Sequence, residues 1–111
     1  MDIKIQKQNT RVFNQVKIDE QGSPIAVMEN GEPKLDVNGN PVYETELKAR
    51  ISFYFSEAMN YPVLTTVVDW PATLEQIEAK VLAIAQQHKD AAEQTLILND
   101  NVKLLDNLQV S

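Results

Sequence analysis

The thirteen residues Tyr43–Phe55 read YETELKARISFYF and decide the fold, because two kinds of side chain alternate along them with a period of two. One face carries Tyr43, Thr45, Leu47, Ala49, Ile51, Phe53 and Phe55, and the other carries Glu44, Glu46, Lys48, Arg50, Ser52 and Tyr54. This pattern predicts a strand buried on one face. At roughly 3.3 Å per residue it spans about 43 Å, so we expect a bend, a bulge, or pairing beyond one subunit.

A second strand is predicted directly after the first. Residues Val63–Trp70 read VLTTVVDW, with β-branched side chains on both faces, which is typical of a strand buried on both sides. The loop Glu57–Pro62 then closes an antiparallel pair.

A repeated phrase precedes the long strand. Val16–Ile25 reads VKIDEQGSPI and Pro33–Val42 reads PKLDVNGNPV, so that Lys, Asp, Gly and Pro recur in register. Gly-x-Pro occurs three times, at Gly22, Gly31 and Gly39, and Asn-Gly at two of these places. Asn-Gly between short apolar runs is a strong hairpin signal. The sequence therefore predicts a meander of short strands, at Arg11–Ile18, Ile25–Met28 and Lys34–Val37.

The chain changes character at Pro71, after which there is no glycine, proline or aromatic residue. Thr73 and Gln76 form a capping-box pattern that opens a helix at Leu74. Its apolar stripe has spacings of three and four and runs through Leu74, Ile77, Val81, Ile84, His88, Ala91, Thr95, Leu98, Val102, Leu105 and Gln109.

Two features of this helical half leave alternatives open. Asn99, Asp100 and Asn101 are poor helix formers, so we expect a break there, although one helix through Gln109 also fits the stripe. Leu82 and Ala85 widen the stripe, which favours packing on a sheet over a coiled coil. The predicted fold is α+β, with an antiparallel sheet of hairpins followed by a C-terminal amphipathic helix. We expect one domain over residues 1–111, β-rich over 1–70 and helical over 71–111.

Composition excludes several classes of partner and chemistry. The net charge of −6 repels nucleic acids and anionic membranes, so we expect neither as a partner. The acids gather between Asp19 and Glu46, where seven face the single Lys34. There is no cysteine, which excludes disulfides and thiolate chemistry. No apolar run suits a signal peptide or a membrane span, so we expect synthesis and release in the cytoplasm.

No group of residues calls for catalysis or a cofactor. His88 is the one histidine and has no partner ligand for zinc, so a satisfied or interface histidine is expected. Asp36, Asn38 and Asn40 have calcium-loop spacing, but the sixth and twelfth positions are Pro41 and Leu47, which favours a hairpin turn. We expect a protein without enzymatic activity, metal or cofactor.

The phrase Lys-x-Asp-x-x-Gly-x-Pro, at Lys17–Pro24 and Lys34–Pro41, resembles turn segments of bacteriophage tail and baseplate proteins and of bacterial surface modules, and the layout is similar to small phage virion accessory proteins. The resemblance implies a structural or assembly protein that contacts itself or other virion proteins and has its place in a virion. The second hypothesis is an acidic monomeric binding module or inhibitor of a host protein. Candidate interface residues are Arg50, Tyr54, His88, Leu98 and Leu105.

Overall fold

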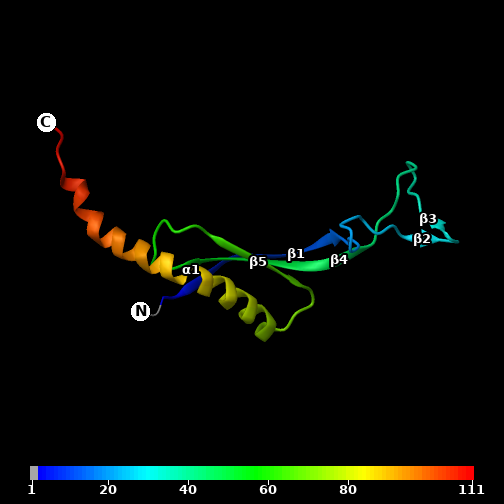
Figure 1. Ribbon diagram of the computed structural model, residues 1–111, viewed down its shortest axis with the longest axis horizontal. Helices are drawn as coiled ribbons and strands as arrows, with labels where there is room; N and C mark the ends of the chain where they lie inside the picture. Colours follow the sequence, from blue (N-terminus) through cyan, green and yellow to red (C-terminus); the bar gives the residue numbers. More distant parts are fainter. Residues whose placement is uncertain (1–2) are drawn as a thin grey trace.

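Strand β4 (Thr45–Phe55) is the central strand of an antiparallel sheet, as its alternation predicts. The computed structural model describes residues 3–111. β4 lies between β1 (Ile5–Val16) and β5 (Leu64–Asp69), and helix α1 (Leu74–Val102) packs across the sheet (Figure 1). The predicted α+β fold is thereby confirmed.

The hydrophobic core lies between α1 and one face of the sheet. It is made of Ala49, Ile51, Phe53, Phe55, Ala58, Leu64, Val68, Val81, Ala85 and Ala92. Within β5 buried and exposed residues alternate, and Val67 is 43% exposed. The prediction that this strand is buried on both faces is wrong, because α1 covers only one side of the sheet. The opposite side is called the open face below.

Strand β1 begins earlier than the sequence indicates. It pairs with β4 from Ile5 to Val16, with a register shift between Lys7 and Asn9. The polar run Gln6–Thr10 hides this part of the strand from a hydrophobicity pattern. A bulge re-aims a strand locally, so the irregularity expected for the long strand lies in its partner, β1.

Residues 17–44 leave the sheet as a projecting arm, which contains the hairpin of β2 (Met28–Glu29) and β3 (Glu32–Pro33). The two copies of the repeated phrase form equivalent turns. The Oδ1 atom of Asp19 accepts hydrogen bonds from the backbone N–H of Gln21 and Ser23, each 2.9 Å long. Asp36 does the same with Asn38 and Asn40. The hairpins are confirmed, but the strands predicted at Ile25–Met28 and Lys34–Val37 are reduced to isolated bridges and the two-residue ladder of β2 with β3.

Backbone hydrogen bonds hold the arm together in two closed rings of three. In each ring every residue donates its N–H to one member and accepts from the other, at 2.8–3.0 Å. The first ring joins Lys17, Ile25 and Glu44, and the second joins Val27, Lys34 and Val42. No side chain of the arm is fully buried. Backbone hydrogen bonds, and not an apolar core, therefore hold the arm in its conformation.

Helix α1 starts as predicted, with Thr73 as N-cap and a complete capping box to Gln76. The expected break at residues 99–101 is absent, because α1 continues to Val102 and passes into a 3₁₀ helix, η1 (Lys103–Asn107). Asn99 donates its side-chain amide to the carbonyl of Met59 at 2.9 Å, so a tertiary contact offsets its low helix propensity. No helix in the described part of the chain combines the length and apolar character needed to cross a membrane.

The molecule is elongated, with extents of 75 × 40 × 24 Å. Its radius of gyration is 21.9 Å, whereas a compact chain of this length has about 13 Å. The arm and the C-terminal end of α1 lie at opposite ends of the long axis (Figure 1). Both projections therefore extend away from the core.

Candidate functional site

The open face of the sheet carries two of the predicted interface residues. Arg50 and Tyr54 alternate along β4 with the core residues Ile51, Phe53 and Phe55, so both lie on the side of the sheet away from α1. Arg11 lies directly opposite Arg50 on β1, and Phe13 lies two residues further along. Tyr54 borders a shallow hollow of about 480 Å³ beside the β4–β5 loop. This uncovered face is the first candidate interaction surface.

Phe13 lies close to two guanidinium groups on this face. The Cζ atom of Arg50 is 5.1 Å from the centroid of the Phe13 ring, and that of Arg11 is 5.9 Å away. Both distances fall within the range of a cation–π interaction. The ion pairs found within residues 3–111 involve Lys48 and Lys89, and neither arginine takes part in one. Arg11, Phe13 and Arg50 are called the arginine cluster below.

Lys48 on the same face is neutralised within the chain. Its Nζ atom forms a hydrogen-bonded ion pair with Asp69 and lies 3.3 Å from Glu46. The hydrogen bond to Asp69 raises the pKa of Lys48, and the same contact lowers the pKa of Asp69. Arg11 and Arg50 form no ion pair with a carboxylate in the described residues. Their positive charges therefore remain free to pair with a carboxylate of another molecule.

His88, another predicted interface residue, is engaged inside the molecule. Its Nδ1 atom is 2.6 Å from the hydroxyl of Tyr61, and the two rings meet edge to face with centroids 5.8 Å apart. Tyr61 also contacts Phe55 edge to face at 5.6 Å. The histidine is half-buried and ties α1 to the β4–β5 loop.

Leu98 and Leu105 lie on the projecting C-terminal segment, 57% and 56% exposed. Leu104 and Leu108 are each 70% exposed on the same segment. Large apolar side chains gathered on a monomer's surface mark an interaction site. This segment is the second candidate surface, and it projects from the core at the end of the long axis opposite the arm (Figure 1).

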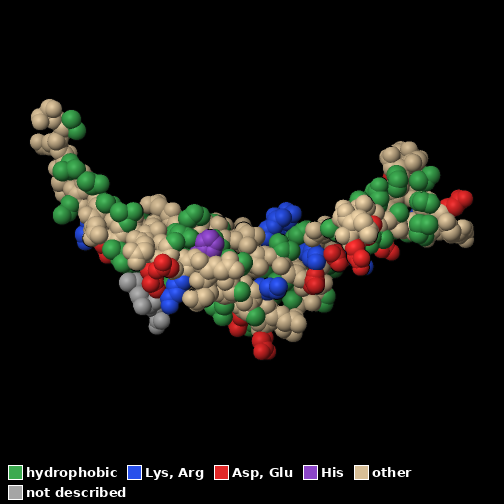
Figure 2. Space-filling view, viewed as in Figure 1, with side chains coloured by type: hydrophobic (Ala, Val, Ile, Leu, Met, Phe, Trp, Pro, Cys, Tyr) green, Lys and Arg blue, Asp and Glu red, His purple; other side chains and the backbone are tan. Residues whose placement is uncertain are grey.

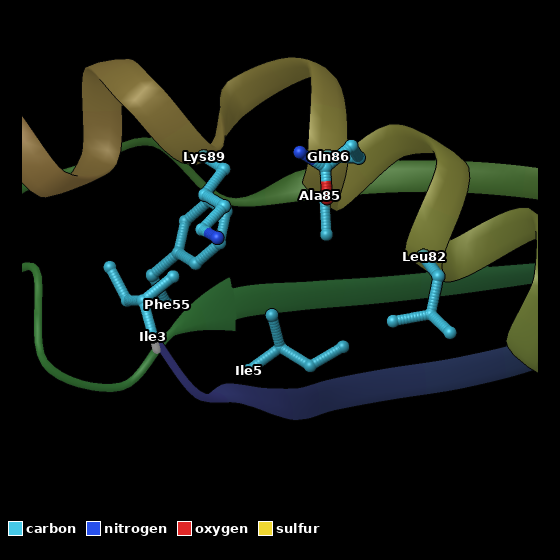
Figure 3. A pocket seen from close by; sticks show the side chains of 7 residues that line it. All are labelled: Ile3, Ile5, Phe55, Leu82, Ala85, Gln86 and Lys89. Carbon is cyan, nitrogen blue, oxygen red and sulfur yellow. The ribbon is translucent and has the colours of Figure 1, made fainter. Parts of the chain in front are cut away.

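An open groove of about 400 Å³ separates α1 from the beginning of β1 (Figure 3). Ile3, Ile5 and Phe55 face Leu82, Ala85, Gln86 and Lys89 across it. Lys89 is 3.9 Å from Glu93. The lining is mainly apolar with one amine at the rim, and it offers neither a nucleophile nor a pair of carboxylates.

The residues considered as metal ligands have structural roles. The Oδ1 atom of Asp36 accepts hydrogen bonds from two backbone N–H groups of its turn, as that of Asp19 does. Within residues 3–111 no group of three or more His, Asp or Glu side chains is placed to hold a metal ion. No family model, curated protein or solved structure matched the chain.

The five predicted interface residues are therefore not one site. Arg50 and Tyr54 share the open face, Leu98 and Leu105 share the helix end, and His88 belongs to an internal contact. Sequence reasoning missed Arg11 and Phe13. Their place in the cluster follows from the pairing of β1 with β4, which sets Arg11 opposite Arg50. That register is known only from the structure.

Proposed function

We propose that the protein is a non-enzymatic structural subunit that assembles with copies of itself. The observation that carries this proposal is its surface area. The chain exposes 8672 Å². A compact monomer of 12.5 kDa exposes about 6,200 Å². The excess of about 2,500 Å² is well above the roughly 800 Å² that each partner buries in a stable interface.

The distribution of the exposed surface supports the same proposal. Leu98, Leu104, Leu105 and Leu108 on the C-terminal segment are each more than half exposed, so the core of the same chain covers little of their apolar area. The arm projects at the other end with no apolar core of its own. Segments of this kind are stabilised when they pack on another subunit, because burial of apolar area then offsets their conformational entropy.

Within this class we propose a virion component of the tail or baseplate type, incorporated after synthesis in the cytoplasm. The support is the repeated turn phrase at Lys17–Pro24 and Lys34–Pro41, which forms two equivalent tight turns in a projecting arm. Such an arm suits a subunit that reaches across to its neighbours in a particle.

The test is self-association of a variant that alters both candidate surfaces. Tyr54→Ala combined with Leu105→Asp is expected to weaken assembly at least tenfold, measured as the concentration at which sedimentation shows half of the chains assembled. Gln87→Asp adds the same charge at an exposed position of α1 and serves as control. Assembly of the double variant at the wild-type concentration contradicts the proposed contacts.

The charge of the arm favours the second candidate function, an acidic module that occupies a basic site on another protein. Acidic side chains gather on the arm in Figure 2. Glu20, Glu29, Glu32 and Glu44 are exposed there, whereas Asp19 and Asp36 are committed to their turns. Binding through these glutamates weakens steeply with salt. Partner binding that is insensitive to salt, measured by titration calorimetry, contradicts this function.

A further inference from the structure

The arginine cluster combines two like charges that the fold places directly opposite each other. Arg11 and Arg50 are Cα partners in the β1–β4 ladder, and like charges in directly opposed positions destabilise a sheet. Both side chains are exposed, and no carboxylate within residues 3–111 forms an ion pair with either. An isolated chain gains nothing from this arrangement except contact with Phe13.

The tip of the arm repeats this pattern with the opposite sign. Glu29 and Glu32 are Cα partners in the β2–β3 hairpin, so the two carboxylates stand on one face of the ladder. Asn30 and Gly31 between them have φ values of 55° and 81°, the left-handed conformation of a tight two-residue turn. Both glutamates are exposed, and none of the ion pairs of the described chain includes them.

We propose that the tip of the arm of one copy docks on the arginine cluster of a second copy, with Glu29 and Glu32 pairing with Arg11 and Arg50. This inference rests on the proposed function, assembly with copies of itself, and it specifies one contact. Each like-charge pair is relieved by the other when the two surfaces meet.

The glutamate pair and the arginine pair have opposite charges, and their backbone geometry is also similar. Directly opposed residues of antiparallel strands have Cβ atoms about 4.5–5.5 Å apart in any ladder, so the two glutamates and the two arginines leave their backbones at the same spacing. Arginine and carboxylate form bidentate, charge-assisted hydrogen bonds. Phe13, beside both arginines, supplies an apolar anchor of the type found at the centre of interfaces.

The tip reaches the arginine cluster of another copy and not that of its own chain. From Arg11 to the end of β1 at Val16 the strand covers about 16 Å, and the arm begins beyond that point and continues outward (Figure 1). In a twofold arrangement each arm docks on the other chain, so the contact forms twice.

Charge reversal in the full chain tests the contact. One variant carries Arg11→Glu and Arg50→Glu, and a second carries Glu29→Arg and Glu32→Arg. Each is expected to assemble at least tenfold more weakly than the wild type, measured by sedimentation velocity over a concentration series. The variant with all four substitutions, and an equimolar mixture of the two double variants, are expected to regain assembly.

A matched control separates the tip from the general charge of the arm. Glu20→Arg with Glu44→Arg changes net charge by the same amount away from the tip and is expected to assemble like the wild type. Circular dichroism melting verifies that each variant folds. The contact is overturned if the fourfold variant and the mixture stay dissociated, or if the control weakens assembly as much as the tip variant.

The results also distinguish this contact from the proposed function. If the wild type assembles and the arginine variant assembles equally well, the proposed contact is wrong but the proposed structural function still holds. If the wild type is monomeric at every concentration, both the contact and the proposed function are wrong.

Discussion

At the residue scale, the hydroxyl of Tyr61 joins the β4–β5 loop to α1 through His88. Loss of this hydroxyl in Tyr61→Phe leaves the Nδ1 atom of a half-buried ring without its 2.6 Å partner. The free energy of unfolding is expected to fall by about 1 kcal/mol. Urea denaturation measures it, with Tyr43→Phe, at a 40% exposed tyrosine, as control. Equal midpoints for the Tyr61 variant and the wild type contradict the assignment.

Lys48 and Asp69 make stability depend on pH. The pKa of Asp69 is lowered, so its contribution is present above the ordinary value of 3.8 and is lost as the pH falls below it. The pKa of Lys48 is raised, so its contribution is present below 10.5 and is lost as the pH rises further.

The expected result is that Asp69→Asn is less stable than the wild type at pH 7 and equally stable once the pH is well below 3.8. NMR titration of the Asp69 carboxyl carbon should give a midpoint that rises in Lys48→Met. Lys34→Met, at a lysine of the arm, should leave it unchanged. A midpoint indifferent to Lys48 would show that the ion pair does not form in solution.

At the scale of elements, the sequence predicts the features that depend on interactions between neighbouring residues. The alternation of Tyr43–Phe55 places β4, and Thr73 with Gln76 places the start of α1 within one residue. Both signals are short-range, because a pleat and a capping box involve only neighbouring residues. Tertiary contacts decided the rest. Asn99 stays helical through its bond to Met59, and the open face of β5 is exposed because no second layer covers it.

The candidate site shows the same division. Arg50 and Tyr54 are found from the alternation of one strand, but the arginine cluster needs the register of β1 against β4, including the shift at Lys7–Asn9. One residue of slip in that register places Arg11 on the opposite face. Nothing local in the sequence fixes it.

The arm is the element whose integrity depends most on single polar side chains. In Asp36→Ala two side-chain hydrogen bonds to the backbone are lost. We expect hydrogen exchange at Asn38 and Asn40 to accelerate roughly fivefold, for a loss of about 1 kcal/mol, while the melting temperature of the core stays the same. Glu20→Ala, at a glutamate outside these bonds, is the control. Unchanged exchange in Asp36→Ala would mean that the backbone rings alone hold the turn.

At the scale of the whole molecule, the core is small for the surface that the chain exposes. A small core between one helix and one sheet face supports two projections at the ends of a 75 Å axis. The apolar C-terminal segment, the open face and the acidic tip of the arm all lie outside that core. Copies of the same chain can cover these surfaces, because each copy carries both the acidic tip and the arginine cluster that the tip of another copy would contact.

The most direct test is the molar mass of the wild-type chain, measured by light scattering during size-exclusion chromatography over a range of concentrations at low and high salt. We expect a molar mass of at least twice 12.5 kDa at low salt, and dissociation at high salt because charged pairs contribute to the contact. A mass of 12.5 kDa at every concentration and salt would contradict the claim that this chain is built to assemble with itself.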